Sequence, residues 1–138
     1  MGVPLIDGAR DAVEAVAGRW RLGLASSANR PIIELILEET GLGVQFETAV
    51  SSEEVARGKP APDVYLETAR RLGVDPEHCA AVEDSSNGLR SAESAGMRVI
   101  AVPNRDFPPE PDALALAEVV LGSIRKLTPG VISSLACA

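Results

Sequence analysis

The sequence predicts an α/β fold in which a parallel, doubly wound (Rossmann-like) sheet carries helices on both faces. Two observations lead to this prediction. Short apolar runs of strand length alternate along the chain with segments whose apolar residues recur at helical spacing. The apolar runs, such as Cys79–Val82 and Val99–Val102, lack polar alternation, which is typical of strands buried on both faces. We expect one domain over residues 1–138, with right-handed crossovers.

The first half of the chain is expected to supply two helices and two strands. Asp7 is the expected cap of the first helix, and Gly18 ends it. Pro31 suits the first turn of the second helix, which we expect to be strongly buried because aliphatic residues dominate Ile32–Leu37. In order, we expect a helix over Ala9–Ala17, a strand over Arg21–Ala25, a helix from Pro31 to Gly41 and a strand over Thr48–Val50.

The second half continues the alternation. Pro62 and Asp63 begin a helix that Gly73 closes, and Gly96 ends the next helix. The proline-rich segment Pro103–Pro111 is expected to be an extended surface loop. In order, we expect a helix over Pro62–Leu72, a strand ending at Glu83, a helix over Asn87–Ala95, a strand over Val99–Val102, a short helix over Asp112–Ala117, an edge strand over Val119–Leu121 and a closing helix from Thr128.

Composition excludes several classes of partner. The formal charge is −7 and the charges are scattered, which argues against nucleic acid or an anionic membrane surface. We find no apolar run long enough to span a membrane and no signal peptide. The two cysteines, Cys79 and Cys137, fit neither a metal spacing nor a disulfide framework, so we expect a cytoplasmic protein.

Polar residues follow three of the predicted strands. Ser26 ends the first strand, Lys59 lies in the loop after the second, and Glu83 and Asp84 end the third. Because ligands bind at the carboxyl edge of open α/β sheets, we expect these residues to meet there. Individually each has a plainer interpretation: Ser26 as part of a helix-capping loop, Lys59 as a solvated surface lysine, and the acids as the cap of the helix that follows.

Together these residues suit phosphoryl chemistry. Glu83 and Asp84 are oxygen ligands of the kind that Mg²⁺ prefers. Lys59 supplies a positive charge and Ser26 a hydroxyl, while the backbone N–H groups from Ser27 to Asn29 precede a helix whose amino end favours anions. The predicted catalytic residues are Ser26, Lys59 and Asp84, the predicted phosphate ligands Ser26, Ser27, Asn29 and Lys59, and the predicted Mg²⁺ ligands Glu83 and Asp84.

These motifs resemble those of the haloacid dehalogenase-like hydrolase superfamily, in its phosphatase and β-phosphoglucomutase-like branch. The resemblance covers about Val3–Val102 and rests on Ser26, on Lys59 in Gly-Lys-Pro-Ala-Pro-Asp, on Glu83 and Asp84 in Val-Glu-Asp-Ser, and on Ala92–Met97. It implies a Mg²⁺-dependent phosphatase or phosphomutase-type hydrolase that acts on a small phosphorylated metabolite through an aspartyl-phosphate intermediate.

The family's first motif, Asp-x-Asp-Gly-Thr, is missing from this sequence. That motif supplies the nucleophilic aspartate of the family, and Asp7-Gly8 does not match it because no apolar strand precedes it. The resemblance therefore implies a truncated part of a longer enzyme that lacks the first strand and the substrate-selecting cap. We expect this chain alone to be inactive. The alternative is an inactive remnant that binds phosphate, metal or a partner protein.

The resemblance also implies that the missing strand is central, between the strands ending at Ser26 and Glu83. Omitting about five buried apolar residues, at roughly 1.5–3 kcal/mol each, removes on the order of 10 kcal/mol of stabilising free energy from the folded state. We expect the gap to be closed by contraction of the sheet, by a terminal segment such as Val131–Leu135, or by a partner chain, with homo-oligomers forming through exposed strand edges. A receiver domain is disfavoured, because Lys59-Pro60 precedes the acidic pair.

Overall fold

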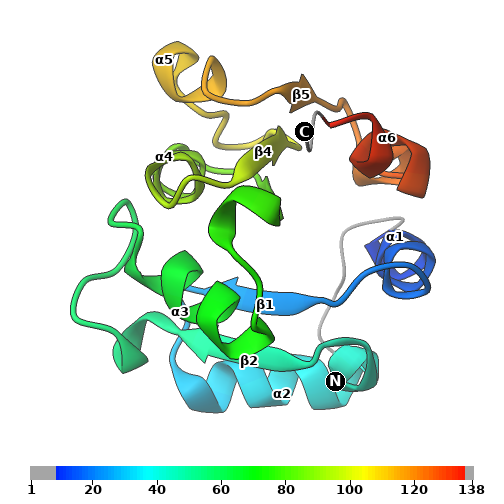
Figure 1. Cartoon of the computed structure of the whole chain (residues 1–138), viewed down its shortest axis with the longest axis vertical. Coiled ribbons are helices and arrows are strands. Elements are labelled where there is room, and N and C mark those ends of the chain that lie inside the picture. Colours follow the sequence, from blue (N-terminus) through cyan, green and yellow to red (C-terminus); the bar gives the residue numbers. More distant parts are fainter. Residues whose placement is uncertain (1–8, 136–138) are drawn as a thin grey trace.

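The computed structural model describes residues 9–135, in which helices and parallel strands alternate (Figure 1). The helices are α1 Ala9–Ala17, α2 Arg30–Thr40, α3 Asp63–Leu72, α4 Ser86–Ser94, α5 Pro111–Leu114 and α6 Pro129–Ser134. The strands are β1 Gly23–Ser26, β2 Thr48–Ser51, β3 Ala80–Glu83, β4 Arg98–Ala101 and β5 Val119–Val120. The predicted order of elements is confirmed, with boundaries shifted by at most three residues. The expected cap Asp7 lies outside the described residues.

The strands form two separate parallel groups. β1 pairs with β2, with Gly23 opposite Thr48, and the second group has the order β3-β4-β5, with Ala80 opposite Arg98. Figure 1 shows the two groups apart from each other, with α1 and α6 along one side. The α/β fold with parallel pairing is confirmed, and no described strand lies between β1 and β3.

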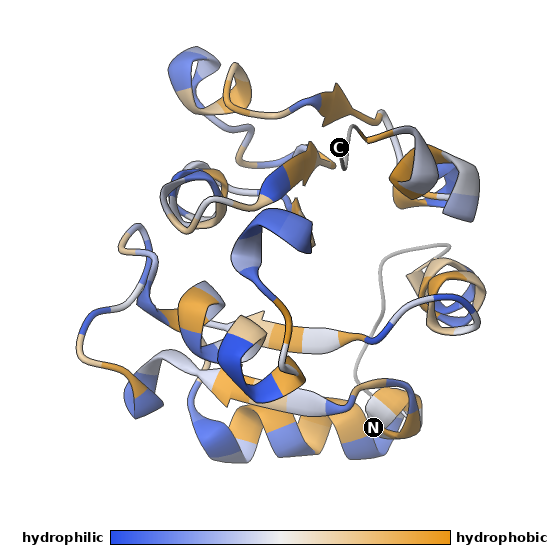
Figure 2. Cartoon of the chain, in the orientation of Figure 1, coloured by the Kyte–Doolittle hydropathy of each residue, from blue (hydrophilic) through white to orange (hydrophobic). Residues whose placement is uncertain are grey.

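Two hydrophobic cores lie on opposite faces of the strands. The first joins both strand groups through α3 and α4, and it includes Val50 of β2, Val64 of α3, Ala81 of β3 and Leu89 of α4. The second packs α1 against β4 and the segment around α6, and it includes Val16, Ile100, Leu127 and Leu135. Figure 2 shows that β4 and β5 are mostly hydrophobic, and β4 contributes Val99 and Ala101 to the first core and Ile100 to the second. The first core therefore packs residues of both strand groups against α3 and α4.

Three expectations about burial and closure are wrong. Helix α2 is not strongly buried: Ile33 is buried, but Ile32 and Leu35 are 46% and 50% exposed. The segment 131–135 does not fill the gap as a strand, because α6 runs to Ser134 after Pro129 and the Thr128 side chain caps its first turn. The sheet has not contracted either, since β1 and β3 do not pair with each other. Within residues 9–135, none of the helices has the length and apolar character needed to cross a bilayer.

Candidate active site at the carboxyl ends of β1 and β3

Lys59 links the carboxyl ends of β1 and β3. Its ammonium lies 2.5 Å from Oε2 of Glu83, the last residue of β3, and 3.3 Å from the carbonyl oxygen of Ala25 in β1. The two charged side chains are 11% and 8% exposed. Lys59 is therefore not a solvated surface lysine, and the predicted meeting of the two strand ends is confirmed.

Two hydrogen bonds hold the loop that carries Lys59. The Ala61 N–H donates to the carbonyl of Gly58 at 3.0 Å, which closes the loop around Lys59. The buried Ser91 hydroxyl of α4 donates to the carbonyl of Ala61 at 2.6 Å. Because α4 follows directly after β3, this bond fixes the Lys59 loop relative to the acidic strand end.

Tyr65 is a third member of this cluster, and it was not among the predicted site residues. Its hydroxyl donates a short hydrogen bond to Oε2 of Glu83, and the Lys59 ammonium lies 5.2 Å from the centre of its ring. Burial, and then the charge of Glu83, raise the pKa of Tyr65 well above its ordinary value. The phenol is therefore a stable hydrogen-bond donor. The rule that a buried tyrosine needs a polar partner could have indicated a hydrogen bond from the Tyr65 hydroxyl.

Gly88 lies directly against the Glu83 carboxylate. A Cβ atom added at Gly88 would lie 1.9 Å from Oε1 of Glu83, closer than two such atoms can approach. Gly88 is buried in the first turn of α4, where its N–H donates to the Ser85 hydroxyl at 3.1 Å. Lys59, Tyr65 and Gly88 thus hold one carboxylate from three sides. The cap of α4 is Ser85, so the capping interpretation of Glu83 and Asp84 is wrong.

The loop after β1 is tied to the loop after β2. The Ser26 hydroxyl accepts from the Ala28 N–H at 3.1 Å, which turns the chain at the strand end. The Ser51 hydroxyl donates to the Ala28 carbonyl at 2.7 Å, and the Ser52 hydroxyl donates to the Ser27 carbonyl at 3.2 Å. Sequence reasoning did not assign Ser51, although it also ends a strand at the carboxyl edge.

Asn29 lies apart from the other predicted phosphate ligands. Its side chain caps α2 by accepting from the Ile32 N–H at 3.1 Å, and it does not border the cavity that the other predicted residues line. The helix-capping role suggested for Ser26 therefore belongs to Asn29. A phosphate contact from Asn29 would have to be made by an N–H donor, of its side-chain amide or of its backbone, because the oxygen that caps α2 is an acceptor.

Asp84 follows β3 and is less enclosed than Glu83. The Asn104 amide donates to its carboxylate at 3.4 Å, and the Asn104 N–H donates to its carbonyl oxygen at 3.2 Å. Asn104 follows the end of β4, so its position at the carboxyl edge was a signal that sequence reasoning did not use. Among the described side chains, no cluster of three or more histidines, cysteines or acids could hold a metal ion.

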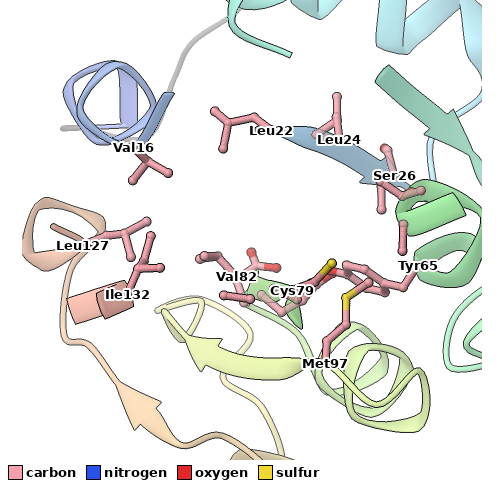
Figure 3. Close-up of a pocket in the computed structure, with 18 of the residues that line it drawn as sticks. Val16, Leu22, Leu24, Ser26, Tyr65, Cys79, Val82, Met97, Leu127 and Ile132 are labelled. Carbon is pink, nitrogen blue, oxygen red and sulfur yellow. The ribbon is translucent and has the colours of Figure 1, made fainter. Parts of the chain in front are cut away.

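Five of the six predicted site residues line one cavity of about 1480 Å³: Ser26, Ser27, Lys59, Glu83 and Asp84. Figure 3 shows this cavity with Ser26 of β1 on one side and Val82 of β3 on the other. Glu83 and Asp84 are oxygen donors of the kind that a hard cation prefers, and the Oε2 atom of Glu83 is bound by Lys59 and Tyr65. The arrangement offers an ammonium, a hydroxyl and two carboxylates around one opening.

Known proteins resemble this chain in sequence. Hexitol phosphatase B of Escherichia coli K12 is 40% identical over 126 residues, which cover 91% of this chain and 56% of that protein. The chain therefore spans little more than half the length of this relative. The haloacid dehalogenase-like hydrolase family matches residues 2–96.

Solved structures show the same fold. The CbbY protein of Rhodobacter sphaeroides, determined in complex with phosphate, has a TM-score of 0.80 at 35% identity, over 89% of this chain and 56% of that one. A β-phosphoglucomutase from Clostridium difficile has a TM-score of 0.78 at 25% identity, over 94% and 55%. With the family match spanning most of its length and the same fold in these proteins, this chain belongs to the haloacid dehalogenase-like hydrolases.

Proposed function

We propose that the chain is the larger part of a Mg²⁺-dependent phosphatase or phosphomutase-type hydrolase that acts on a small phosphorylated metabolite. The observation that carries this proposal is the buried cluster in which Lys59 joins Glu83 of β3 to the end of β1. The relatives named above as a hexitol phosphatase and a β-phosphoglucomutase support this reaction class, and a phosphorylated sugar or sugar alcohol is the substrate class that their names indicate.

Each residue of the cluster would have a defined part in phosphate binding. The Lys59 ammonium would balance negative charge on the phosphate, as preorganised cations do in phosphoryl transfer. The hydroxyl of Ser26 and the N–H groups of the Ser27–Asn29 loop would donate to phosphate oxygens. Glu83 and Asp84 would hold Mg²⁺, which screens the phosphate from nearby carboxylates when bound. Tyr65 would keep Glu83 in place.

The covalent step needs an aspartate that the described residues do not supply. Its carboxylate would attack phosphorus, the alcohol would leave with a proton from an acid, and water would then release inorganic phosphate. The acids that line the described cavity are Glu83, Asp84 and Glu110, and Glu110 pairs with Arg90 at 3.1 Å. We therefore propose that the nucleophile comes from a segment outside this sequence and that this chain alone does not turn over substrate.

A phosphatase assay tests these statements. With para-nitrophenyl phosphate and Mg²⁺, the 138-residue chain is expected to show no turnover. Turnover that Asp84→Asn abolishes would contradict the proposed inactivity. Reading the DNA upstream of Met1 tests the origin of the nucleophile: an in-frame Asp-x-Asp-Gly-Thr supports the enzyme. Phosphatase activity of the extended chain on phosphorylated sugars should then depend on Lys59 and Asp84.

The second candidate is a binding protein without catalytic activity. The absence of a free catalytic carboxylate among the described cavity residues favours it. An upstream reading frame without the motif, together with retained binding of inorganic phosphate or Mg²⁺, would decide for this candidate. In either case we propose a cytoplasmic location, because Cys79 is a free thiol whose pKa is raised by burial and which forms no disulfide.

A further inference from the structure

β2 ends in a serine that is completely buried. Ser51 is 0% exposed, as is the apolar Val50 before it. A buried hydroxyl group costs free energy unless it is hydrogen-bonded. The Ser51 hydroxyl accepts from the Glu53 N–H at 3.1 Å and donates to the Ala28 carbonyl at 2.7 Å. Its proton is therefore committed to the loop after β1, which comprises residues 27–29.

A second serine binds the same loop. The Ser52 hydroxyl donates to the Ser27 carbonyl at 3.2 Å, so Ser51 and Ser52 together bind the carbonyls of two consecutive residues. Ser27 and Ala28 line the cavity of the candidate site, whereas the two serines that bind them do not. The two carbonyl oxygens therefore point toward the β2 side. This orientation keeps two negative ends of peptide dipoles turned away from an anion in the cavity.

The orientation of this loop determines how the Ser26 hydroxyl is used. In a trans peptide the carbonyl and the N–H that follows it point in opposite directions. With the Ser27 carbonyl bound by Ser52, the Ala28 N–H points the other way, and it donates to the Ser26 hydroxyl at 3.1 Å. Accepting this bond occupies a lone pair of the Ser26 oxygen and leaves its proton for another acceptor. The Ser26 hydroxyl, which borders the cavity, is therefore prepared to donate.

We propose that Ser51 and Ser52 are positioning residues for the phosphate site. They hold the two peptides on either side of Ala28, and through Ala28 they keep the Ser26 hydroxyl directed as a donor to a phosphate oxygen. Neither serine contacts the ligand itself. This assignment rests on the proposed function, because it takes Ser26 and the loop after β1 as phosphate ligands. Ser51 has the larger part, since its bond is shorter and completely buried.

A phosphate titration of the 138-residue chain tests this proposal. The probe is inorganic phosphate in millimolar MgCl₂, and the amide resonances of Ser27 and Ala28 report its binding. Ser51→Ala removes the donor to the Ala28 carbonyl, so the peptide is no longer held and the Ser26 hydroxyl loses its fixed direction. We expect the dissociation constant for phosphate to rise at least about fivefold. Ser52→Ala should raise it about two- to fivefold.

Thr40→Val is the matched control for the loss of a buried hydroxyl. Thr40 is 5% exposed, and its hydroxyl donates to the Ile36 carbonyl at 2.6 Å and accepts from the Leu42 N–H at 3.3 Å. These are the same two kinds of bond that Ser51 makes, but Thr40 does not line the cavity. The control should lower the melting temperature as Ser51→Ala does and leave the dissociation constant for phosphate unchanged.

Hydrogen exchange at the Ala28 amide is a second readout, which needs no ligand. In the unmodified chain this N–H is bound to the Ser26 hydroxyl. In Ser51→Ala it should exchange at least about tenfold faster, because local opening no longer breaks the bond to Ser51. The Leu89 amide, bound to the Ser85 carbonyl at 2.9 Å in α4, reports the remainder of the fold and should change less than the Ala28 amide.

Ser26→Ala distinguishes this proposal from the proposed function. If the unmodified chain binds no phosphate, or if Ser26→Ala leaves phosphate binding unchanged, the phosphate site and the roles of Ser51 and Ser52 fail together. If Ser26→Ala weakens phosphate binding and the folded Ser51→Ala and Ser52→Ala variants bind as the unmodified chain does, only the positioning roles are overturned. Should Ser51→Ala not fold, Ser52→Ala decides, because it releases the adjacent carbonyl of the same loop.

Discussion

Lys59 and Glu83 form an ion pair of 2.5 Å between side chains that are 11% and 8% exposed. The pair joins the loop after β2 to the end of β3, and the same ammonium contacts the end of β1. Because β1 and β3 belong to different strand groups, this contact is a direct polar link between the two halves of the fold. The charge that would bind phosphate is therefore also part of the folded structure.

Lys59→Met is expected to destabilise the chain strongly. Removing one partner of a buried pair leaves an uncompensated charge, which costs about 3–5 kcal/mol of the free energy of unfolding. Urea unfolding followed by circular dichroism measures this loss. Arg98→Met is the matched control, because its pair with Glu118 is 3.0 Å long but both side chains are 36% exposed, and it should cost less than about 1 kcal/mol.

A double variant separates charge burial from packing. Lys59→Met combined with Glu83→Gln removes the unpaired charge, so more than half of the lost stability should return. Equal losses for Lys59→Met and Arg98→Met would show that the Lys59 pair is no more important to folding than a surface pair.

The ionisation of Tyr65 is expected to coincide with unfolding. It is the only tyrosine in the chain, so the phenolate absorbance reports this residue alone. Burial, followed by Glu83, raises its pKa well above the ordinary value of 10.0 in the folded state. The stabilisation that depends on the neutral phenol is complete below pH 10 and decreases as the pH rises above it. An alkaline titration should therefore show phenolate only as the far-ultraviolet circular dichroism is lost.

Glu83→Gln is the control for the titration. It removes the second cause of the pKa shift and leaves burial, so phenolate should appear at lower pH than in the unmodified chain but still above pH 10. Phenolate formation near pH 10 with an intact circular dichroism spectrum would show that Tyr65 is accessible to solvent and does not hold Glu83.

The convergence of Ser26, Lys59, Glu83 and Asp84 could be predicted from the sequence. Each follows or ends an apolar run of strand length, and the carboxyl ends of parallel strands meet at one edge whatever the details of packing. Tyr65 could not be assigned in the same way. The direction of its hydroxyl depends on where α3 lies relative to β3, which no local pattern contains.

Burial depends on which elements cover a surface, and the sequence near α2 contains no information about that. The aliphatic residues of α2 predicted a buried helix, yet Ile32 and Leu35 are about half exposed. For residues 131–135, local signals for the start of a helix compete with an apolar composition that suits a strand. Thr128 and Pro129 favour the start of a helix, and this capped turn determines the structure of the segment.

Gly88→Ala is expected to displace the Glu83 carboxylate. The new Cβ would lie 1.9 Å from Oε1 of Glu83, whose other oxygen is bound by Lys59 and Tyr65, so the carboxylate cannot move without losing a partner. We expect a loss of about 1–3 kcal/mol in the free energy of unfolding. Gly43→Ala is the matched control, because its Cβ would meet Leu37 at an ordinary 3.5 Å.

The clash at Gly88 also predicts non-additivity. Gly88→Ala combined with Glu83→Ala removes the atom that the new methyl group meets, so the double variant should be more stable than the sum of the single losses implies. Additive losses would place the cost of Gly88→Ala elsewhere in α4.

Asp84→Asn is expected to abolish stabilisation by Mg²⁺. A ligand that binds only the folded state raises the melting temperature, and Asp84 is the more open of the two predicted ligands, with a single 3.4 Å contact from the Asn104 amide to its carboxylate. The shift should be measured in millimolar MgCl₂ against NaCl of equal ionic strength, because a net charge of −7 is screened by any salt. Asp106→Asn, at an exposed acid in the loop after β4, is the matched control and should keep the full shift. An unmodified chain that Mg²⁺ does not stabilise, or an Asp84→Asn variant with an unchanged shift, would remove Asp84 as a metal ligand in this chain.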